Sequence, residues 1–407
     1  MEMIKGGVTA AKGFKAAGVE AAIKYKNRKD MALVYSEVPA IVAGTFTTNV
    51  VKAAPVLWDM EIVNHQESAQ AVVLNSGIAN ACTGEEGVFA NKAMALAIAD
   101  CLELPVTSVL TASTGVIGKQ LPVDRITVGA KLLAENLSSS IEAGHQAALA
   151  IMTTDTICKE CAVSFTYQGK TITVGAMSKG SGMIHPNMAT MLAVVTSDIS
   201  ISKELLMKAV KADVKDTYNM ISVDRDTSTN DSMLVLCNGF ADNERITDEN
   251  EGYQLFCEAL KLVNTNLSKM MAKDGEGATK LLEVKAIHCN TKEEAIALSK
   301  SVITSNLVKT AVYGSDANWG RILCAMGYSG VDFDPYQVDV TVTGAVGTLK
   351  LVENGMATDY SEEFATMILK QEEVTAIIDM KNGEAEATAW GCDLTYDYVK
   401  INGDYRS

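Results

Sequence analysis

Short runs of aliphatic and β-branched residues alternate along this chain with alanine-rich segments of helical periodicity, and this alternation restricts the possible folds more than any other feature. Residues 71–75 (Ala-Val-Val-Leu-Asn) predict a buried strand. Residues 88–104 predict a helix, because their apolar positions recur at helical spacing among good helix formers. Helical patterns return at 125–137, 202–220 and 249–271. The sequence therefore predicts an α/β fold of mixed α+β layers.

The C-terminal part of the chain has a different pattern. Earlier in the chain, residues 107–110 are expected to lead into a turn and residues 171–175 resemble a strand. In the C-terminal part, by contrast, residues 336–343 and 388–400 alternate with a period of two. Such alternation is typical of antiparallel strands with one buried face. No linker, repeat or low-complexity tract divides the 407 residues. Their number fits two or three folding units, or one large two-layer body.

Charge and cysteine content limit the partners and the compartment. The formal net charge of −15 lacks the basic footprint of a nucleic-acid-binding protein and disfavours an anionic membrane surface, so small molecules are the expected ligands. The nine cysteines are an odd number in mostly apolar contexts, which favours a reducing compartment. The sequence has neither a signal-peptide pattern nor an apolar run of membrane-spanning length. We therefore expect a cytoplasmic protein.

Several motifs that could bind a metal or a cofactor are incomplete. Cys158-x-x-Cys161 has the right spacing, but no second Cys or His pair follows nearby. Asp224-x-Asp226 begins like a calcium loop and then lacks its glycine and closing glutamate. Residues 115–119 (Gly-Val-Ile-Gly-Lys) have neither Walker nor dinucleotide-binding spacing. We therefore expect no metal and no bound cofactor.

The segment with the clearest chemistry ends at Ala189-Thr190, after a glycine-rich approach that starts at Lys179. A threonine hydroxyl is a poor nucleophile at neutral pH unless a base adjoins it. Cleavage of the peptide bond before Thr190 would free an α-amine, with a pKa of about 7.7 to 8.0, that can act as this base. The alternative is an ordinary turn into a buried strand.

Nine ordered motifs run nearly from end to end of the chain. They are residues 6–18 (GGVTAAKGFKAAG), 79–84 (ANACTG), 113–118 (STGVIG), 151–155 (IMTTD), 179–184 (KGSGMI), 188–192 (MATML), 226–231 (DTSTND), 274–280 (DGEGATK) and 318–322 (NWGRI). On these motifs the chain closely resembles the ornithine acetyltransferase family of arginine biosynthesis. This family is also called glutamate N-acetyltransferase, and many members also have amino-acid N-acetyltransferase activity.

The resemblance implies a reaction and a processed chain. Acetyl passes from N2-acetylornithine to Thr190 and then to glutamate in a ping-pong reaction without a cofactor, giving ornithine and N-acetylglutamate. Self-cleavage separates an α chain, 1–189, from a β chain, 190–407, and two such pairs form a heterotetramer. The family fold resembles, but is distinct from, that of the N-terminal nucleophile hydrolases.

The resemblance also assigns site residues. Thr190 is the nucleophile, Ala189 and Thr190 flank the cleaved bond, and Thr114 with Gly115 form the oxyanion hole. The substrate-contacting positions are Thr153, Lys179, Thr190, Glu276, Asn402 and Ser407. Lys179 suits a carboxylate and Glu276 a cationic amine.

Two positions depart from the family pattern, which commonly has Asn at Ile78 and Gly at Arg225. They bear on local loop shape and substrate preference rather than on the reaction.

Two other classes remain open. An N-terminal-threonine amidase or aminopeptidase would use water to deacylate Thr190, and a non-catalytic binding protein would stay uncut. No motif indicates whether acetyl-CoA is also accepted as a co-substrate, which would make the enzyme bifunctional.

Overall fold

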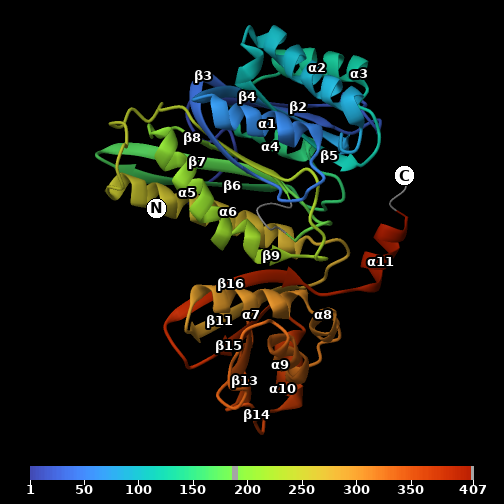
Figure 1. Ribbon diagram of the computed structural model, residues 1–407, viewed down its shortest axis with the longest axis vertical. Helices are drawn as coiled ribbons and strands as arrows, with labels where there is room; N and C mark the ends of the chain where they lie inside the picture. The colour runs from blue at the N-terminus through green and yellow to red at the C-terminus, as the bar shows by residue number, and fades with distance from the viewer. Residues whose placement is uncertain (186–190, 405–407) are drawn as a thin grey trace. The chain divides into compact units, whose positions relative to one another are not determined.

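The computed structural model describes residues 1–185 and 191–404 and divides them into two compact units (Figure 1). Unit 1 comprises 1–180, 191–219 and 227–267, and unit 2 comprises 181–185, 220–226 and 268–404. The predicted cleavage site, Ala189-Thr190, and Ser407 lie outside the described residues. The α chain, 1–189, and the β chain, 190–407, are expected cleavage products and stay a prediction. The two compact units are a different division of the chain.

Unit 1 is built on a nine-stranded sheet in the order β1-β6-β7-β8-β10-β3-β4-β5, with β2 paired to β3. Its strands are β1 (Glu2–Ile4), β2 (Phe14–Val19), β3 (Met31–Phe46), β4 (Ser68–Ile78), β5 (Val109–Val116), β6 (Lys159–Tyr167), β7 (Lys170–Lys179), β8 (Leu192–Ser197) and β10 (Ser232–Cys237). Its helices are α1 (Ala54–His65), α2 (Gly84–Leu102), η1 (Val106–Ser108), α3 (Val123–Glu135), α4 (Ile141–Ala150) and α5 (Lys203–Asp216). The chain passes between the units more than once. One passage lies within η2 (Tyr218–Met220), after Asn219, and the last lies within α6 (Glu251–Lys273), after Leu267.

Both faces of the unit 1 sheet are covered, because successive side chains of a strand point to opposite sides. On β4, Val72 and Leu74 join one core cluster with residues of α1 and α4. Ala71 and Val73 join another with residues of α2 and α3, two helices that pack on each other (Figure 1). The near-continuous apolar run of β4 therefore reflects burial on both faces.

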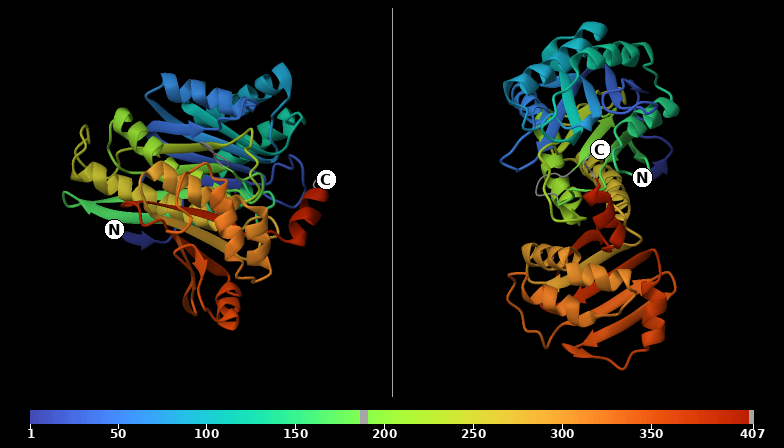
Figure 2. Two further views of the ribbon diagram at one scale, coloured as in Figure 1. Left: turned by 60° about the horizontal axis from the view of Figure 1, so that its bottom comes forward. Right: turned by 90° about the vertical axis from the view of Figure 1, so that its right-hand side faces the viewer.

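Unit 2 has a seven-stranded sheet in the order β14-β13-β12-β15-β11-β16-β9. Its strands are β9 (Ile221–Ser222), β11 (Leu281–Cys289), β12 (Asp339–Gly344), β13 (Gly347–Glu353), β14 (Met356–Ala357), β15 (Glu373–Asp379) and β16 (Ala385–Cys392). Its helices are α7 (Lys292–Thr304), α8 (Asn306–Tyr313), α9 (Trp319–Gly327), α10 (Glu362–Leu369) and α11 (Tyr396–Gly403). Helix α7 packs on β11 and β16, and the views in Figure 2 show this layering of helix on sheet.

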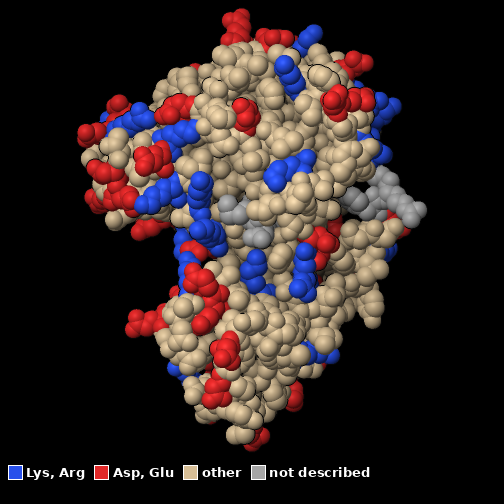
Figure 3. Space-filling view, viewed as in Figure 1, with Lys and Arg blue, Asp and Glu red and all other residues tan. Residues whose placement is uncertain are grey.

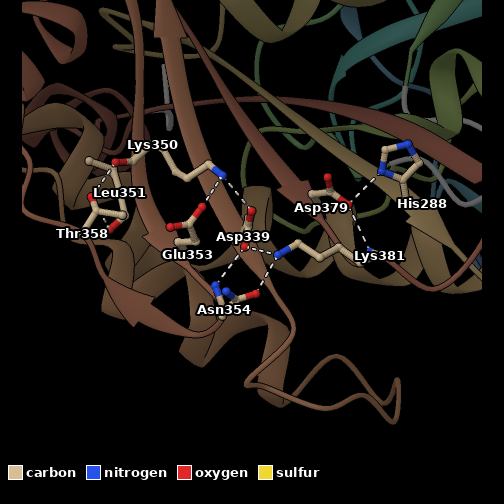
Figure 4. Close-up of polar contacts among 9 residues, drawn as sticks. All are labelled: His288, Asp339, Lys350, Leu351, Glu353, Asn354, Thr358, Asp379 and Lys381. Carbon is tan, nitrogen blue, oxygen red and sulfur yellow. Dashed lines mark hydrogen bonds and ion pairs between the residues drawn. The ribbon is translucent and has the colours of Figure 1, made fainter.

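A carboxylate at the start of β12 joins several parts of unit 2. Asp339 accepts from Lys350 Nζ at 2.9 Å, from Asn354 N at 2.9 Å and from Lys381 Nζ (Figure 4). Burial disfavours its charge, but the two ammonium groups and the backbone N–H outweigh burial and lower the pKa of Asp339 to about 2. The network holds the β12–β13 hairpin to the residues after β15.

The predicted helices and most predicted strands are confirmed within a few residues, and so is the mixed α/β class. The interpretation of 388–400 as strand is wrong in its second half. Strand β16 ends at Cys392, and α11 starts after Thr395, whose hydroxyl accepts from Tyr398 N. Residues 107–110 lead from η1 into β5 rather than into a turn, and α5 ends at Asp216, short of 220.

No described helix combines the length and the apolar character of a membrane span. On the face drawn in Figure 3, Lys and Arg side chains lie among Asp and Glu side chains.

Candidate active site

Lys179, the last residue of β7, brings together two more of the predicted site residues. Its Nζ lies 2.9 Å from Thr153 Oγ1 and 3.3 Å from Thr114 Oγ1. Both hydroxyls accept, since an ammonium only donates, and each keeps its own proton for another acceptor. Lys179 also pairs with Leu192 across the antiparallel β7–β8 ladder, two residues after Thr190. The predicted cation and two predicted hydroxyl residues thus form one cluster in unit 1.

The predicted oxyanion pair lies on β5, where the backbone has an unusual course. Thr114 and Gly115 pair with Ser76 and Gly77 of β4, and the ladder is irregular at Ile78. Gly115 has φ +131, and a Cβ there would lie 2.2 Å from the carbonyl carbon of Gly77. Only glycine fits both the angle and the close approach. The departure at Ile78 therefore lies beside the oxyanion pair, with its side chain buried in the core.

An amide just before β10 fixes the end of β5. Asn230 Nδ2 donates to Ser113 O at 2.8 Å and to Ala79 O at 2.6 Å. Ser113 directly precedes the oxyanion pair, so the buried Asn230 holds the backbone from which Thr114 and Gly115 project. Asn230 lies in one of the family motifs, but its sequence position did not indicate this contact.

Asp155 is a charged residue of the cluster that the sequence reasoning missed. Its side chain is fully buried and lies 2.7 Å from Lys159 Nζ and 3.9 Å from Lys179 Nζ. It also accepts from Gly180 N at 2.7 Å and Thr153 N at 3.0 Å. Burial alone would raise the pKa of Asp155, but the charges of Lys179 and Lys159 outweigh burial and hold it below its usual range. Asp155 thus anchors both Thr153 and Lys179.

A second buried acid, Asp231, follows Asn230. Burial raises its pKa well above the usual range, opposed by a hydrogen bond from Ser228 and the charge of Lys179. Its Oδ2 has no hydrogen-bond partner within the described part of the chain. Asp231 is next to Ser232, whose N–H donates to Met191 O at 2.9 Å. A buried carboxyl group with a raised pKa therefore lies beside Met191, the residue that follows Thr190.

Unit 2 holds two of the other predicted residues. Glu276 Oε2 accepts from Asn402 Nδ2 at 2.7 Å. The Glu276 backbone N–H donates to Ser181 O at 2.8 Å, and a Cβ at Gly182 would lie 2.3 Å from the carboxyl carbon of Glu276. Gly182 therefore leaves the space that the Glu276 carboxylate occupies.

Three hydrogen bonds fix the segment that carries Asn402. Thr395 Oγ1, at the start of α11, donates to Gly277 O at 2.7 Å. Asp393 accepts from Thr279 N at 2.8 Å and Lys280 N at 3.1 Å. The loop of Glu276 and the helix of Asn402 are thereby tied together at several points, so their side chains meet.

The backbone at Arg225 explains why glycine is the common family residue at this position. Arg225 has φ +71, a left-handed conformation that glycine adopts without strain and other residues adopt at a cost. Its neighbour Asp224 accepts from Met183 N and Ile184 N at 2.7 and 2.8 Å. The turn that holds residues 183–184 therefore favours glycine at position 225 on conformational grounds.

The predicted site thus falls into two described groups. Thr114, Gly115, Thr153 and Lys179 lie in unit 1, whereas Glu276 and Asn402 lie in unit 2. Ala189, Thr190 and Ser407 are outside the described residues. Three side chains of metal-ligating type form a separate cluster in unit 1: His145, Cys158 and Glu160.

A buried ammonium in contact with two hydroxyls, beside a strand glycine of positive φ, is a polar cluster of the kind that enzymes of mixed α/β fold use. A family model described as the ArgJ family matches residues 15–407. The chain belongs to the ArgJ family. This confirms the expected relationship to the enzymes of arginine biosynthesis.

Relatives match the chain over its full length. It is 52% identical over 407 residues to the arginine biosynthesis bifunctional protein ArgJ of Caldanaerobacter subterraneus, with 100% of both chains covered. It is 51% identical over 400 residues to ArgJ 1 of Clostridium acetobutylicum, with 98% and 97% covered. A solved ornithine acetyltransferase of Mycobacterium tuberculosis, complexed with ornithine, is 41% identical. That match covers 47% of this chain and 98% of the other, with a TM-score of 0.43.

Proposed function

We propose that the protein transfers acetyl from N2-acetylornithine to glutamate through an acetyl ester on Thr190. Thr190 Oγ attacks the acetyl carbon, the amide C–N bond breaks, and ornithine leaves with the proton. The glutamate amine then attacks the ester, so that N-acetylglutamate forms and the Thr190 hydroxyl is restored. The reaction exchanges one amide for another, and it therefore needs no cofactor.

The observation that carries this proposal is the contact of Lys179 with Thr114. Because the Thr114 hydroxyl accepts from the ammonium, its own proton is directed to a different acceptor. The carbonyl oxygen of the acetyl group, which becomes negative in the tetrahedral intermediate, is the acceptor we assign. The positive charge of the buried Lys179 strengthens the donor. Gly115 N–H is the second donor of the oxyanion hole.

We assign substrate contacts by family position to Thr153, Lys179, Glu276, Asn402 and Ser407. The Glu276 carboxylate, with Asn402 bound to one oxygen, suits a cationic amine such as that of ornithine. Lys179 suits a substrate carboxylate.

Self-cleavage between Ala189 and Thr190 supplies the base of this reaction, the freed α-amine. The products are an α chain of 189 residues and a β chain of 218 residues, and two of each form a heterotetramer. All nine cysteines are free thiols, which supports a cytoplasmic location. Acetyl-CoA is the alternative acetyl donor, and it fits the word bifunctional in the names of the relatives.

Intact-mass analysis tests the transfer. The β chain should gain one acetyl group with N2-acetylornithine alone and lose it when glutamate is added, with N-acetylglutamate as the product. Thr190→Ala should remain one uncut, inactive chain, whereas Thr107→Ala, at an exposed threonine, should behave as wild type. Free acetate in place of N-acetylglutamate would favour the amidase. Ornithine release without any change of mass would exclude the acetyl-enzyme.

Native mass spectrometry tests the assembly, with two α and two β chains expected. Parallel assays with N2-acetylornithine and with acetyl-CoA as donor distinguish a monofunctional from a bifunctional enzyme.

A further inference from the structure

Three metal-ligating side chains meet in unit 1, outside the groups assigned to acetyl transfer. His145 lies on α4, Cys158 just before β6, and Glu160 on β6. His145 Nδ1 lies 2.5 Å and Cys158 Sγ 3.5 Å from Glu160 Oε2. The three ligand atoms all lie within 4.8 Å of one another, and the three residues are half-buried. The fold thus adds a histidine to a cysteine that had no second ligand in the sequence.

The second carboxylate oxygen of Glu160 lacks a polar contact within residues 1–185 and 191–404. This atom, Oε1, is buried and has no hydrogen-bond partner among the residues that the structure describes. A Cβ at Gly7 would lie 2.7 Å from this oxygen, so glycine at position 7 leaves the space that the Glu160 carboxylate occupies. A buried carboxylate oxygen without a partner is costly, and a positive ligand removes that cost.

The thiol of Cys158 lies against the same carboxylate, with its Sγ 3.5 Å from Glu160 Oε2. Burial and the negative charge of Glu160 raise its pKa to about 12, so forming the thiolate costs part of the metal-binding free energy. A divalent cation offsets that cost because it reverses the local charge and stabilises the thiolate.

We propose that His145 Nδ1, Cys158 Sγ and the Glu160 carboxylate bind one divalent cation of the zinc class, with water as the fourth ligand. Sulfur and imidazole ligands select zinc over magnesium or calcium. On binding, sulfur forms a bond to the metal, the S–H proton passes to water, and His145 ligates as the tautomer protonated on Nε2. No electron is transferred.

The geometry requires a small adjustment. With zinc–ligand distances of about 2.0 to 2.3 Å, tetrahedral ligands lie roughly 3.3 Å (N to O) and 3.5 Å (S to O) apart. The Cys158–Glu160 distance of 3.5 Å already matches. The His145–Glu160 distance of 2.5 Å must open by about 0.8 Å as the metal replaces the shared proton.

The position of the site points to a structural role. Lys159 lies between Cys158 and Glu160, and its Nζ donates to Asp155 at 2.7 Å. Asp155 in turn anchors Thr153 and Gly180. A cation held by α4 and by the first residues of β6 would fix this segment. We therefore expect metal binding to stabilise the fold rather than to take part in acetyl transfer.

Cobalt and zinc titrations of the chelator-treated, full-length protein test the proposal. One Co²⁺ per chain should give a thiolate-to-cobalt charge-transfer band that zinc abolishes, and zinc should raise Tm in a concentration-dependent manner. Cys158→Ser should lose the band. It should also weaken zinc binding by at least the roughly 10- to 100-fold that loss of an outer-shell partner costs. His145→Ala and Glu160→Gln should weaken zinc binding similarly.

Two other cysteines serve as controls. Cys161→Ala, the second cysteine of the C-x-x-C motif, and Cys101→Ser, at an exposed position on α2, should keep both the band and the affinity. Circular dichroism checks the fold of each variant. If Cys158→Ser folds poorly, His145→Ala at its half-exposed helical position remains decisive.

The proposal is overturned by a wild-type protein without the band, by a band that persists in Cys158→Ser, or by zinc affinity unchanged in His145→Ala. Loss of the band in Cys161→Ala would also overturn it and would assign the metal to the cysteine pair. None of these measurements depends on acetyl transfer, so their outcome is independent of the proposed function.

Discussion

Asp155→Asn is expected to destabilise the protein strongly and to impair catalysis for a separate reason. The substitution keeps the shape of the side chain and one carbonyl oxygen, but it removes the negative charge between Lys159 and Lys179. The side chains of Asp155 and Lys159 are 0% and 1% exposed, so water cannot compensate for the lost charge.

The magnitude follows from this burial. Removing one partner of a buried ion pair typically costs about 3–5 kcal/mol, because the other charge remains buried and uncompensated. We expect the free energy of unfolding to fall by that amount at neutral pH. The loss should shrink in acid. Because the pKa of Asp155 is lowered, its carboxylate stabilises the native state fully above the unfolded carboxyl pKa of about 3.9, and this stabilisation is lost progressively as pH falls from there through the lower folded pKa.

Urea unfolding and steady-state kinetics of a double variant separate the two effects. Lys159→Met in the Asp155→Asn background removes the uncompensated ammonium, so at least half of the lost stability should return. The kcat should stay roughly 10- to 100-fold low, because Lys179 still lacks the carboxylate that orients it toward Thr114. Lys159→Met alone is the matched control for the missing lysine.

Two results would refute this reasoning. A loss below about 1 kcal/mol in Asp155→Asn would mean that the buried pair contributes no more than an exposed one. Wild-type kcat in the double variant would mean that Asp155 acts only through stability and does not position Lys179.

Three further predictions concern single positions. Gly115→Ala should lower kcat by about 100-fold or more and raise KM little, because the added Cβ would clash with the backbone of Gly77 and displace the Gly115 N–H that serves as an oxyanion donor; a change in KM alone would contradict this. Arg225→Gly should raise the free energy of unfolding by about 1 kcal/mol by relieving a left-handed conformation, and urea midpoints that stay the same would count against it. Asp339→Asn should cost about 1 kcal/mol at pH 7. That difference should vanish between about pH 4 and pH 2, because the carboxylate with its lowered pKa stabilises the fold only while ionised; a difference that persists at pH 2 would exclude the ion pairs as its source.

The elements that were predictable from sequence are those whose burial is periodic. Strand β4 is apolar at nearly every position because both faces are covered, and α2 repeats its buried residues at helical spacing. The strand prediction for residues 396–400 was wrong because Tyr-Asp-Tyr-Val-Lys alternates like a strand although it forms the start of α11. The decisive signal was the N-cap at Thr395, whose hydroxyl accepts from Tyr398 N.

The site was predictable only as far as motifs carry chemistry. Family motifs supplied Thr114, Thr153 and Lys179, and the structure brings them within hydrogen-bond distance. Asp155 lies in the same motif as Thr153, but nothing in the sequence indicated its ion pair with Lys179. The two residues are far apart in the sequence, and only the folded sheet brings them together. The cluster of His145 with Cys158 and Glu160 was not predicted for the same reason, because the two later residues are more than a helical turn away in the sequence.

The strand order of unit 1 determines what a cut before Thr190 can do. β8 and β10 follow the cut in the chain, yet they lie between β7 and β3, which precede it. β8 bonds to β7 and β10 bonds to β3 along six residue pairs each. The later fragment is therefore inserted into the interior of a sheet that the earlier fragment borders on both sides. Two complete ladders would have to open before the fragments could part. A cleaved molecule is thus a nicked protein that gains a free amino terminus and keeps its topology, and dilution alone should not dissociate it.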